Sequence, residues 1–164
     1  MTAYPFGQAT GSFYVGLHPD EPLPSGAPVL AYGANASPER LERKLPGTRV
    51  AALAGTLRDF AVVHSAHVSP YGAVPATLVR SPGAREDVHV LLVGDAHARL
   101  DATEPNYRRV RLHGVDLEVE RLGRVETVEA YVSHHGPLTD GAGLIPLGTR
   151  PQEELRALLD RPTG

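Results

Sequence analysis

The sequence predicts an α+β fold whose sheet is curled or closed on itself. About seven or eight short β-prone runs follow one another, mainly in hairpin order. The helical segments are few and dispersed, whereas a doubly wound parallel sheet needs a helix after nearly every strand. The chain has 164 residues and no visible internal repeat, which fits a single domain with a substantial core.

The composition excludes several classes of function. There is no cysteine, so disulfides, zinc thiolate sites and thiol catalysis are excluded. A formal net charge of -3 and a pI near 6.2 provide no basic surface for nucleic acid or for an anionic membrane. The first residues lack the basic and apolar regions of a signal peptide, and no apolar run of about 18 residues occurs. We therefore expect a soluble, cytoplasmic protein with no nucleic-acid or membrane partner.

Residues 1–27 are predicted to form an extended or partly ordered N-terminal arm that precedes a single domain at 28–164. The arm is rich in Gly, Pro, Ser and Thr and has neither helical nor alternating periodicity. Within it, Phe13, Tyr14 and Val15 can add a short strand to the domain.

The segment 28–45 is predicted to be a buried strand, a tight turn and a capped helix. Residues 28–32 are almost all apolar, and Gly33 permits a positive φ or the close approach of a ligand. Ser37 and Pro38 suit the N-cap and the first helical position. This arrangement directs backbone N–H groups toward one point, as in sites that hold a carboxylate, a phosphate or a developing oxyanion. A plain connection is the alternative, and the second glycine and the lysine of a P-loop are absent.

The middle of the chain alternates β-prone runs with turn signals such as the loop SPYGAVP. A short helix is expected at 95–103 with Asp95 as its N-cap, and Pro105 disfavours helical geometry at the residue before it. The strands that precede this helix are expected at about 49–57, 60–66, 74–80 and 88–93.

Three further runs with partial alternation, YRRVRL, VDLEVERL and VETVEAYVSHH, predict an antiparallel meander. Gly114 lies between the first two runs, as in a hairpin turn. The last element, 150–159, is expected to be an amphipathic helix in which Thr149 and Gln152 have the spacing of a capping box. The glycine-rich segment 133–148 suits either a lid over a pocket or an ordinary connector.

Glu104 is a candidate for proton transfer if it is buried beside the turn that begins at Gly33. Its own segment, LDATEPNYRR, instead favours a surface side chain or an ion pair with Arg108 or Arg109.

Metal and covalent chemistry are disfavoured. His64 and His67 are three apart, His134 and His135 are adjacent, and neither spacing matches a zinc pattern with a carboxylate partner. Neither G-x-S-x-G nor S-x-x-K occurs in the chain. We expect no metal, no cofactor and no covalent intermediate.

Taken together, two short motifs resemble the γ-glutamylcyclotransferase-like family. LAYGANASPERL is similar to the family's Y-G-S-N-L turn between a strand and a helix. ARLDATEPNYRRVRL resembles its L-D-x-x-E-G segment, at the same distance downstream as in the family. VEAYV is similar to a late tyrosine-bearing strand. The resemblance covers residues 28–133 in order and spacing.

The resemblance implies a small closed β-barrel with peripheral helices and a pocket where the turn meets Glu104. Active members of the family cyclise a γ-glutamyl group to 5-oxoproline and release an amine or amino acid, without a metal or cofactor. The implied partner is therefore a small-molecule γ-glutamyl substrate. By this likeness Glu104 is the catalytic residue, and the substrate-binding residues are Tyr32, Gly33, Ala34, Asn35 and Tyr131.

Three positions depart from the family pattern. Ala34 and Ala36 stand where the family's turn has serine and leucine, and Pro105 replaces the glycine that follows the glutamate. The substrate therefore need not be an ordinary γ-glutamyl amino acid. The alternative is a non-catalytic domain on the same fold that binds a small carboxylate or contacts a protein partner.

Overall fold

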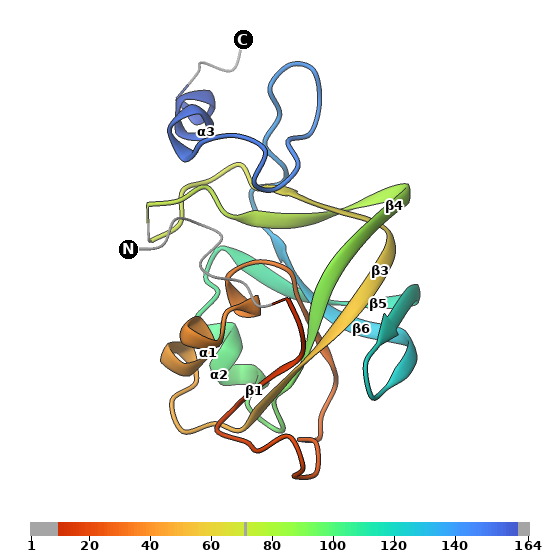
Figure 1. The fold of residues 1–164 in the computed structure, drawn as a ribbon. Coiled ribbons are helices and arrows are strands. Elements are labelled where there is room, and N and C mark those ends of the chain that lie inside the picture. Colours follow the sequence, from red (N-terminus) through yellow and green to blue (C-terminus); the bar gives the residue numbers. More distant parts are fainter. Residues whose placement is uncertain (1–9, 71, 161–164) are drawn as a thin grey trace.

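The computed structural model describes residues 10–70 and 72–160, and its centre is a closed β-barrel (Figure 1). Its strands are β2 (Val29–Ala31), β3 (Val50–His64), β4 (Ala76–Leu92), β5 (Tyr107–Val119) and β6 (Gly123–Ser133). They follow the order β3, β4, β2, β6, β5, and the barrel closes because β5 pairs back to β3. The β2–β6 pairing is parallel, and the other neighbours in the barrel are antiparallel. The predicted α+β class and the closed, antiparallel-rich barrel are therefore confirmed.

A further short strand, β1 (Phe13–Val15), joins the barrel from the N-terminal arm. It pairs antiparallel with the start of β3, and Phe13 lies opposite Ala52. The strand expected at this place is confirmed. Residues 1–9 lie outside the described part of the chain, and the boundary between arm and domain at residue 28 stays a prediction.

β3 and β4 form one long hairpin, so the prediction of two separate strands in each was wrong. The register shifts at Asp59, which has a φ of 66°. The Asp59 carboxylate accepts a hydrogen bond from the N–H of Gly83 across the hairpin at 2.9 Å. Turn-forming residues here produce a bulge, which bends a strand without ending it. Each observed strand merges two predicted segments, 49–57 with 60–66 and 74–80 with 88–93.

The hairpin expected at Gly114 is also wrong, because β5 continues through that residue. Gly114 has a φ of 67° and lies within a register shift between His113 and Leu117. The chain reverses only after Val119, in a turn where Arg121 has a φ of 68°. The positive φ that glycine adopts easily therefore serves a bulge at this position and not a hairpin turn.

Helices flank the barrel on one side and at one end. The turn after β2 forms a short 3-10 helix, η1 (Ala34–Ala36), which is followed by α1 (Pro38–Lys44). α2 (His97–Ala102) precedes β5, and α3 (Gln152–Leu159) comes last. α1 and α2 lie next to each other on one side of the barrel, whereas α3 lies beyond one end of it (Figure 1). Within the described residues, no helix is long and apolar enough to cross a membrane.

The predicted helix starts are correct for α1 and wrong for α2. Ser37 is the N-cap of α1 and Pro38 is its first residue, although the Ser37 side chain makes no capping hydrogen bond. The N-cap of α2 is Ala96, not Asp95, and it makes no side-chain cap either. Packing against the barrel, and not capping, therefore holds these two helices in place.

The capping box predicted for α3 is not formed. Pro151 is the N-cap, so Gln152 is the first helical residue and not the third. The Gln152 side chain instead accepts a hydrogen bond from the backbone N–H of Val74 at 2.6 Å. The side chain predicted to cap the helix thus links it to the loop before β4.

An apolar cluster between the barrel wall and the two neighbouring helices decides where the helices lie. Leu41 and Leu45 around α1 and Leu100 of α2 are at most 1% exposed, and they share a cluster with Val29 and Leu91 of the barrel. Burial of each leucine contributes about 2 kcal/mol. α1 and α2 are therefore held against one wall, which sets the turn before α1 relative to the end of α2.

Candidate functional site

A cavity of about 90 Å³ lies where the turn after β2 meets the segment between α2 and β5. All six residues that the family resemblance assigns to the site line it, namely Tyr32, Gly33, Ala34, Asn35, Glu104 and Tyr131. Lys44, His67, Asn106 and Tyr107 are also among the lining residues. The structure thus brings the predicted residues together, while their roles remain predictions.

The turn after β2 holds Asn35 beside the cavity. Gly33 has a φ of −133°, so the positive φ that glycine permits is not used here. The N–H groups of Ala36 and Ser37 close the 3-10 turn by donating to the carbonyls of Gly33 and Ala34 at 3.0 and 3.1 Å. The N–H groups of Ala34 and Asn35 take no part in these two bonds. The turn is closed by its own backbone and keeps Asn35 only 8% exposed.

Glu104, shortly after α2, belongs to the cavity wall and not to the open surface. Its side chain is 14% exposed. The carboxylate oxygen Oε1 accepts from Nδ2 of Asn35 at 3.2 Å and from Nζ of Lys44 at 2.5 Å. The ion pair with Arg108 or Arg109 that the sequence also allowed is not formed in the described structure. Glu104 and the turn are therefore in direct contact.

Lys44, the last residue of α1, is a cavity residue that the sequence analysis did not identify. Its side chain is 8% exposed, and its ammonium also donates to Oδ1 of Asn35 at 2.8 Å. A buried ammonium group is costly unless it is paired, and here Glu104 supplies the countercharge. One feature of the sequence could have drawn attention to Lys44: it is the single lysine among the 16 Lys and Arg residues of the chain. A count of residue types does not show where in the fold that side chain lies.

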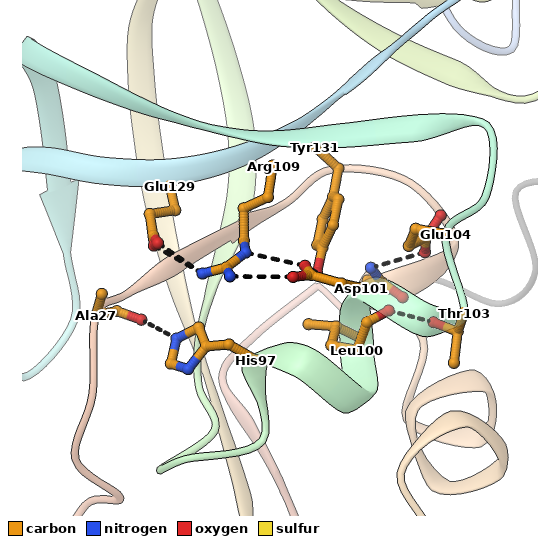
Figure 2. A network of polar contacts seen from close by, with 10 residues as sticks. Ala27, His97, Leu100, Asp101, Thr103, Glu104, Arg109, Glu129 and Tyr131 are labelled. Atoms are coloured by element: carbon orange, nitrogen blue, oxygen red, sulfur yellow. Dashed lines mark hydrogen bonds and ion pairs between the residues drawn. The ribbon is translucent and has the colours of Figure 1, made fainter.

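Arg109 of β5 forms the centre of a second polar network beside the cavity. It donates from Nε and Nη2 to the two carboxylate oxygens of Asp101 at 2.9 and 3.0 Å. It also donates from Nη1 to Glu129 at 2.7 Å. Figure 2 shows Arg109 between Glu129 and Asp101, with the Tyr131 hydroxyl directed at Asp101. Burial raises the pKa of Asp101, but hydrogen bonds from Arg109 and Tyr131 outweigh it and hold that pKa below its ordinary value.

The two tyrosines of the cavity wall have hydroxyl groups that are bonded to the protein. Tyr32 donates to the backbone carbonyl of Tyr131, and Tyr131 donates to Oδ1 of Asp101 at 2.5 Å. Burial, together with the bond to Asp101, raises the pKa of Tyr131 well above its ordinary value. Tyr131 is therefore a neutral phenol near neutral pH, held in one orientation, and not a proton acceptor.

His67 is a second polar cavity residue that the sequence analysis did not assign to the site. Nδ1 lies 2.6 Å from the hydroxyl of Ser65, and the ring stacks on that of His135 with centroids 4.5 Å apart. Burial, with a smaller effect from His135, lowers the pKa of His67 to about 4, so the ring is neutral near neutral pH. Its Nε2 is buried and has no hydrogen-bond partner among the described residues.

No group of three His, Asp or Glu side chains that could hold a metal ion occurs within residues 10–70 and 72–160.

Two of the three departures from the family pattern touch the cavity. Ala34 and Pro105 line it. Ala36 is 3% exposed and belongs to the apolar cluster that contains Leu41 and Leu45. The alanine at position 36 therefore concerns the packing of α1, whereas the alanine at position 34 removes one side-chain hydroxyl group from the part of the cavity wall that the turn forms.

Comparisons with known proteins identify the fold. No protein-family model matches the sequence, and no curated protein matches it. A structure of a γ-glutamyl cyclotransferase aligns with a TM-score of 0.54 and 20% identity, covering 80% of this chain and 86% of that one. An Arabidopsis thaliana protein aligns at 0.53 and 24% identity over 80% of this chain and 81% of its own. An uncharacterised human protein aligns at 0.54 and 18% identity over 84% and 89%, respectively.

At these identities the likeness concerns the fold, and it extends over most of each chain. The suspected resemblance is supported at that level. The chain has the fold of the γ-glutamylcyclotransferase-like proteins.

Proposed function

We propose that the protein is a γ-glutamylcyclotransferase-like enzyme that cyclises a γ-glutamyl amine or amide to 5-oxoproline and releases the amine. One observation carries the proposal: Glu104 and Asn35, which are 69 residues apart, meet in a hydrogen bond at one cavity. The likeness in fold to a γ-glutamyl cyclotransferase supports it.

In the proposed reaction, Glu104 moves the proton. It accepts a proton from the α-amino group of the substrate, whose nitrogen then attacks the γ-carbonyl carbon of the same molecule. The bond from that carbon to the leaving nitrogen breaks, and Glu104 returns the proton to this nitrogen. The protons that leave an α-ammonium end on the released amine, so none is consumed overall. No metal or cofactor takes part.

The other cavity residues orient the substrate. Because the attack is intramolecular, holding the chain in a bent conformation supplies much of the rate. Backbone N–H groups of the turn at Ala34 and Asn35 are suited to an oxyanion that develops on the γ-carbonyl oxygen. The rings of Tyr32 and Tyr131, whose hydroxyl groups are bonded to the protein, shape the wall against which the chain lies.

The test is the release of 5-oxoproline from a panel of γ-glutamylamines and γ-glutamyl amino acids. Glu104→Gln keeps the size of the side chain and an oxygen for Lys44, but it cannot accept a proton. We expect it to lower kcat by about 10³-fold with an unchanged unfolding temperature. Glu126→Gln, which changes a carboxylate that is 75% exposed, is the matched control and is expected to keep full activity. Turnover by Glu104→Gln at the wild-type rate contradicts the mechanism.

A second candidate is a non-catalytic domain that binds a small carboxylate or contacts a protein partner. The observation that favours it is the contact of 2.5 Å between Lys44 and Glu104, because it occupies the carboxylate that the reaction needs. This candidate predicts no 5-oxoproline from any member of the panel. It also predicts that a small carboxylate raises the unfolding temperature of the wild-type protein.

A further inference from the structure

One histidine in the cavity wall has a buried nitrogen that no group in the described chain satisfies. Resting on the proposed cyclisation, we propose that Nε2 of His67 accepts a hydrogen bond from a hydroxyl group on the leaving amine. The substrates are then γ-glutamyl derivatives of an amino alcohol. His67 is the residue that distinguishes them from the derivatives of a plain alkylamine.

The first observation is the missing partner of this nitrogen. Within residues 10–70 and 72–160, the buried side-chain polar atoms without a hydrogen-bond partner are Oγ1 of Thr48 and Nε2 of His67. Of these two residues, His67 lines the cavity and Thr48 does not. A buried polar atom without a partner is costly, so folded proteins keep few of them. The place of this one at a cavity points to a partner that arrives with the ligand.

The second observation is the direction in which the imidazole ring is held. Nδ1 lies 2.6 Å from the hydroxyl of Ser65, and one face of the ring stacks on His135. Neither Ser65 nor His135 lines the cavity, whereas Tyr107, which meets the ring at 71°, does line it. Because the Nδ1 edge and one face are turned to groups outside the cavity, the edge with Nε2 is the polar part of the ring that is left for it.

The hydrogen bonds of Ser65 make Nε2 an acceptor. The Ser65 hydroxyl donates its one hydrogen to Oγ of Ser133 at 2.7 Å, with the carbonyl of Gly136 as a longer alternative at 3.4 Å. Ser65 therefore accepts from the Nδ1–H group of His67. Burial lowers the pKa of His67 to about 4, so near neutral pH the ring has one proton, and that proton is on Nδ1. Nε2 keeps a lone pair and needs a ligand that donates.

The position of His67 in the chain assigns this donor to the leaving group. Glu104 and the turn after β2, which contact each other, form the side of the cavity where the cyclisation is proposed. His67 comes from the loop between β3 and β4, which also contributes Ser69 and Pro70 to the wall. The γ-glutamyl part of the substrate reacts at the first side. The remainder of the substrate is the leaving amine, and it faces the loop.

The charges of the cavity select a neutral donor. Lys44 and Glu104 are the charged side chains among the described residues that line it, and they pair with each other. An ammonium group on the leaving amine has no further carboxylate there, and burying an unpaired charge costs far more than burying a hydroxyl group. A hydroxyl group donates a hydrogen bond without adding charge. Since Nε2 is covered from bulk solvent, the bond that forms does not compete with water.

The turnover test uses pairs of substrates that differ in one group. γ-Glutamylethanolamide is compared with γ-glutamylpropylamide, and γ-glutamyl-3-hydroxypropylamide with γ-glutamylbutylamide, so a hydroxyl group replaces a methyl group in each pair. We expect kcat/KM to be about 10-fold higher for the hydroxyl member of at least one pair. Equal or lower values for the hydroxyl member in both pairs overturn the proposal, as when the hydroxyl group only displaces an ordered water from Nε2.

The variant His67→Phe keeps a planar ring and removes the acceptor. We expect it to lose the preference for the hydroxyl member, with little change for the alkyl member. His113→Phe makes the same substitution at an exposed position outside the cavity, and as the matched control it should keep the preference. His67→Gln offers an amide oxygen and should restore part of it. If His67→Phe does not fold, His67→Leu replaces it, and an unchanged preference in either variant overturns the proposal.

Binding separates this proposal from the proposed function. Calorimetry measures the same ligands on Glu104→Gln, in which the proposed reaction is blocked. A hydroxyl preference in binding without turnover by the wild type means that the cyclisation fails and the role of His67 stands. Turnover without a preference means the reverse.

Nitrogen-15 NMR of the wild-type protein tests the acceptor directly. Nε2 of His67 should be unprotonated at pH 7, and its resonance should shift when the preferred hydroxyl ligand binds. A protonated Nε2, or no measurable binding of any of the ligands, overturns the proposal.

Discussion

Two ion-pair networks flank the end of α2, and they differ in how completely their cations are bonded. Arg109 uses all three of its guanidinium nitrogens on two carboxylates, those of Asp101 and Glu129. Lys44 contacts one carboxylate and one amide and has a donor to spare. Two carboxylates, one from each network, are only three positions apart in the sequence, namely Asp101 beside Arg109 and Glu104 beside Lys44.

The two networks therefore differ in whether their cation can change its hydrogen-bond partners. The planar guanidinium of Arg109 matches the Asp101 carboxylate with two parallel hydrogen bonds, a geometry that a single-point ligand does not replace. The ammonium of Lys44 is a compact charge on a flexible stem, so it can change partners at small geometric cost. We therefore interpret the Arg109 network as the support of the cavity wall and the Lys44–Glu104 pair as the contact that can change partners.

The largest effect on stability is expected when the supporting network loses its cation. Arg109→Met leaves the carboxylates of Asp101 and Glu129 without a countercharge. We expect it to lower the free energy of unfolding by about 3 kcal/mol, the lower end for a buried pair because Asp101 is 40% exposed. Urea denaturation measures the change. Arg108→Met, at the exposed neighbouring position, is the control, and an equal loss in both variants would remove the distinction between the networks.

A smaller effect is expected from His67, whose neutrality leaves Lys44 and Glu104 as the charged groups of the described cavity wall. The pKa of His67 is about 4 in the folded protein, against 6.5 for an ordinary histidine. The unfolded chain therefore binds the proton more readily. Stability is fully present above pH 6.5 and is lost as the pH falls toward 4. The loss between pH 7 and pH 5 is expected to be on the order of 2 kcal/mol.

His67→Gln removes this titration. We expect the wild-type protein to lose more stability than the variant when denaturation is measured at pH 7 and again at pH 5. Parallel losses in the two proteins would show that His67 is protonated in the folded state, and the cavity would then contain a second positive group.

The smallest effect is expected from Tyr131, which lines the cavity and also contacts Asp101 of the Arg109 network. Tyr131→Phe removes the hydrogen bond to Asp101 but keeps the ring in the cavity wall and leaves Arg109 on the carboxylate. We expect a loss of about 1 kcal/mol in the free energy of unfolding, measured by urea denaturation. Tyr14→Phe, whose hydroxyl contacts Arg121 at the surface, should cost less. An equal loss in the two variants would mean that the buried bond to Asp101 contributes no more than the surface contact of Tyr14.

The sequence predicted the closed barrel and the meeting of the turn with Glu104 through two short motifs that resemble one family. The strand, glycine and capped helix around Tyr32 to Pro38 form a continuous segment, and the second motif repeats the spacing known in the family. The errors arose where one residue type serves two structures. Asp59 and Gly114 suit a turn as well as a bulge, and only the pairing of neighbouring strands shows which one is formed.

The partners of the charged residues could not be predicted in the same way. The sequence offered Arg108 or Arg109 to Glu104, because they are near it along the chain. In the structure, Arg109 turns to Asp101 and Glu129, and Glu104 pairs with Lys44 from a different helix. Ion pairing depends on distance in space, and that distance is set by how α1 and α2 share one wall of the barrel.

By itself, then, the sequence determined the fold class from local patterns. Its resemblance to a family placed Tyr32, Gly33, Ala34, Asn35, Glu104 and Tyr131 in one candidate site. Periodicity and turn chemistry are local properties, so they can be read from neighbouring residues. The tertiary structure alone decided the countercharge of Glu104, the support of Tyr131 by Asp101 and the neutral state of His67. Each of these follows from burial and from contacts between distant elements, which the packing of α1, α2 and the barrel creates.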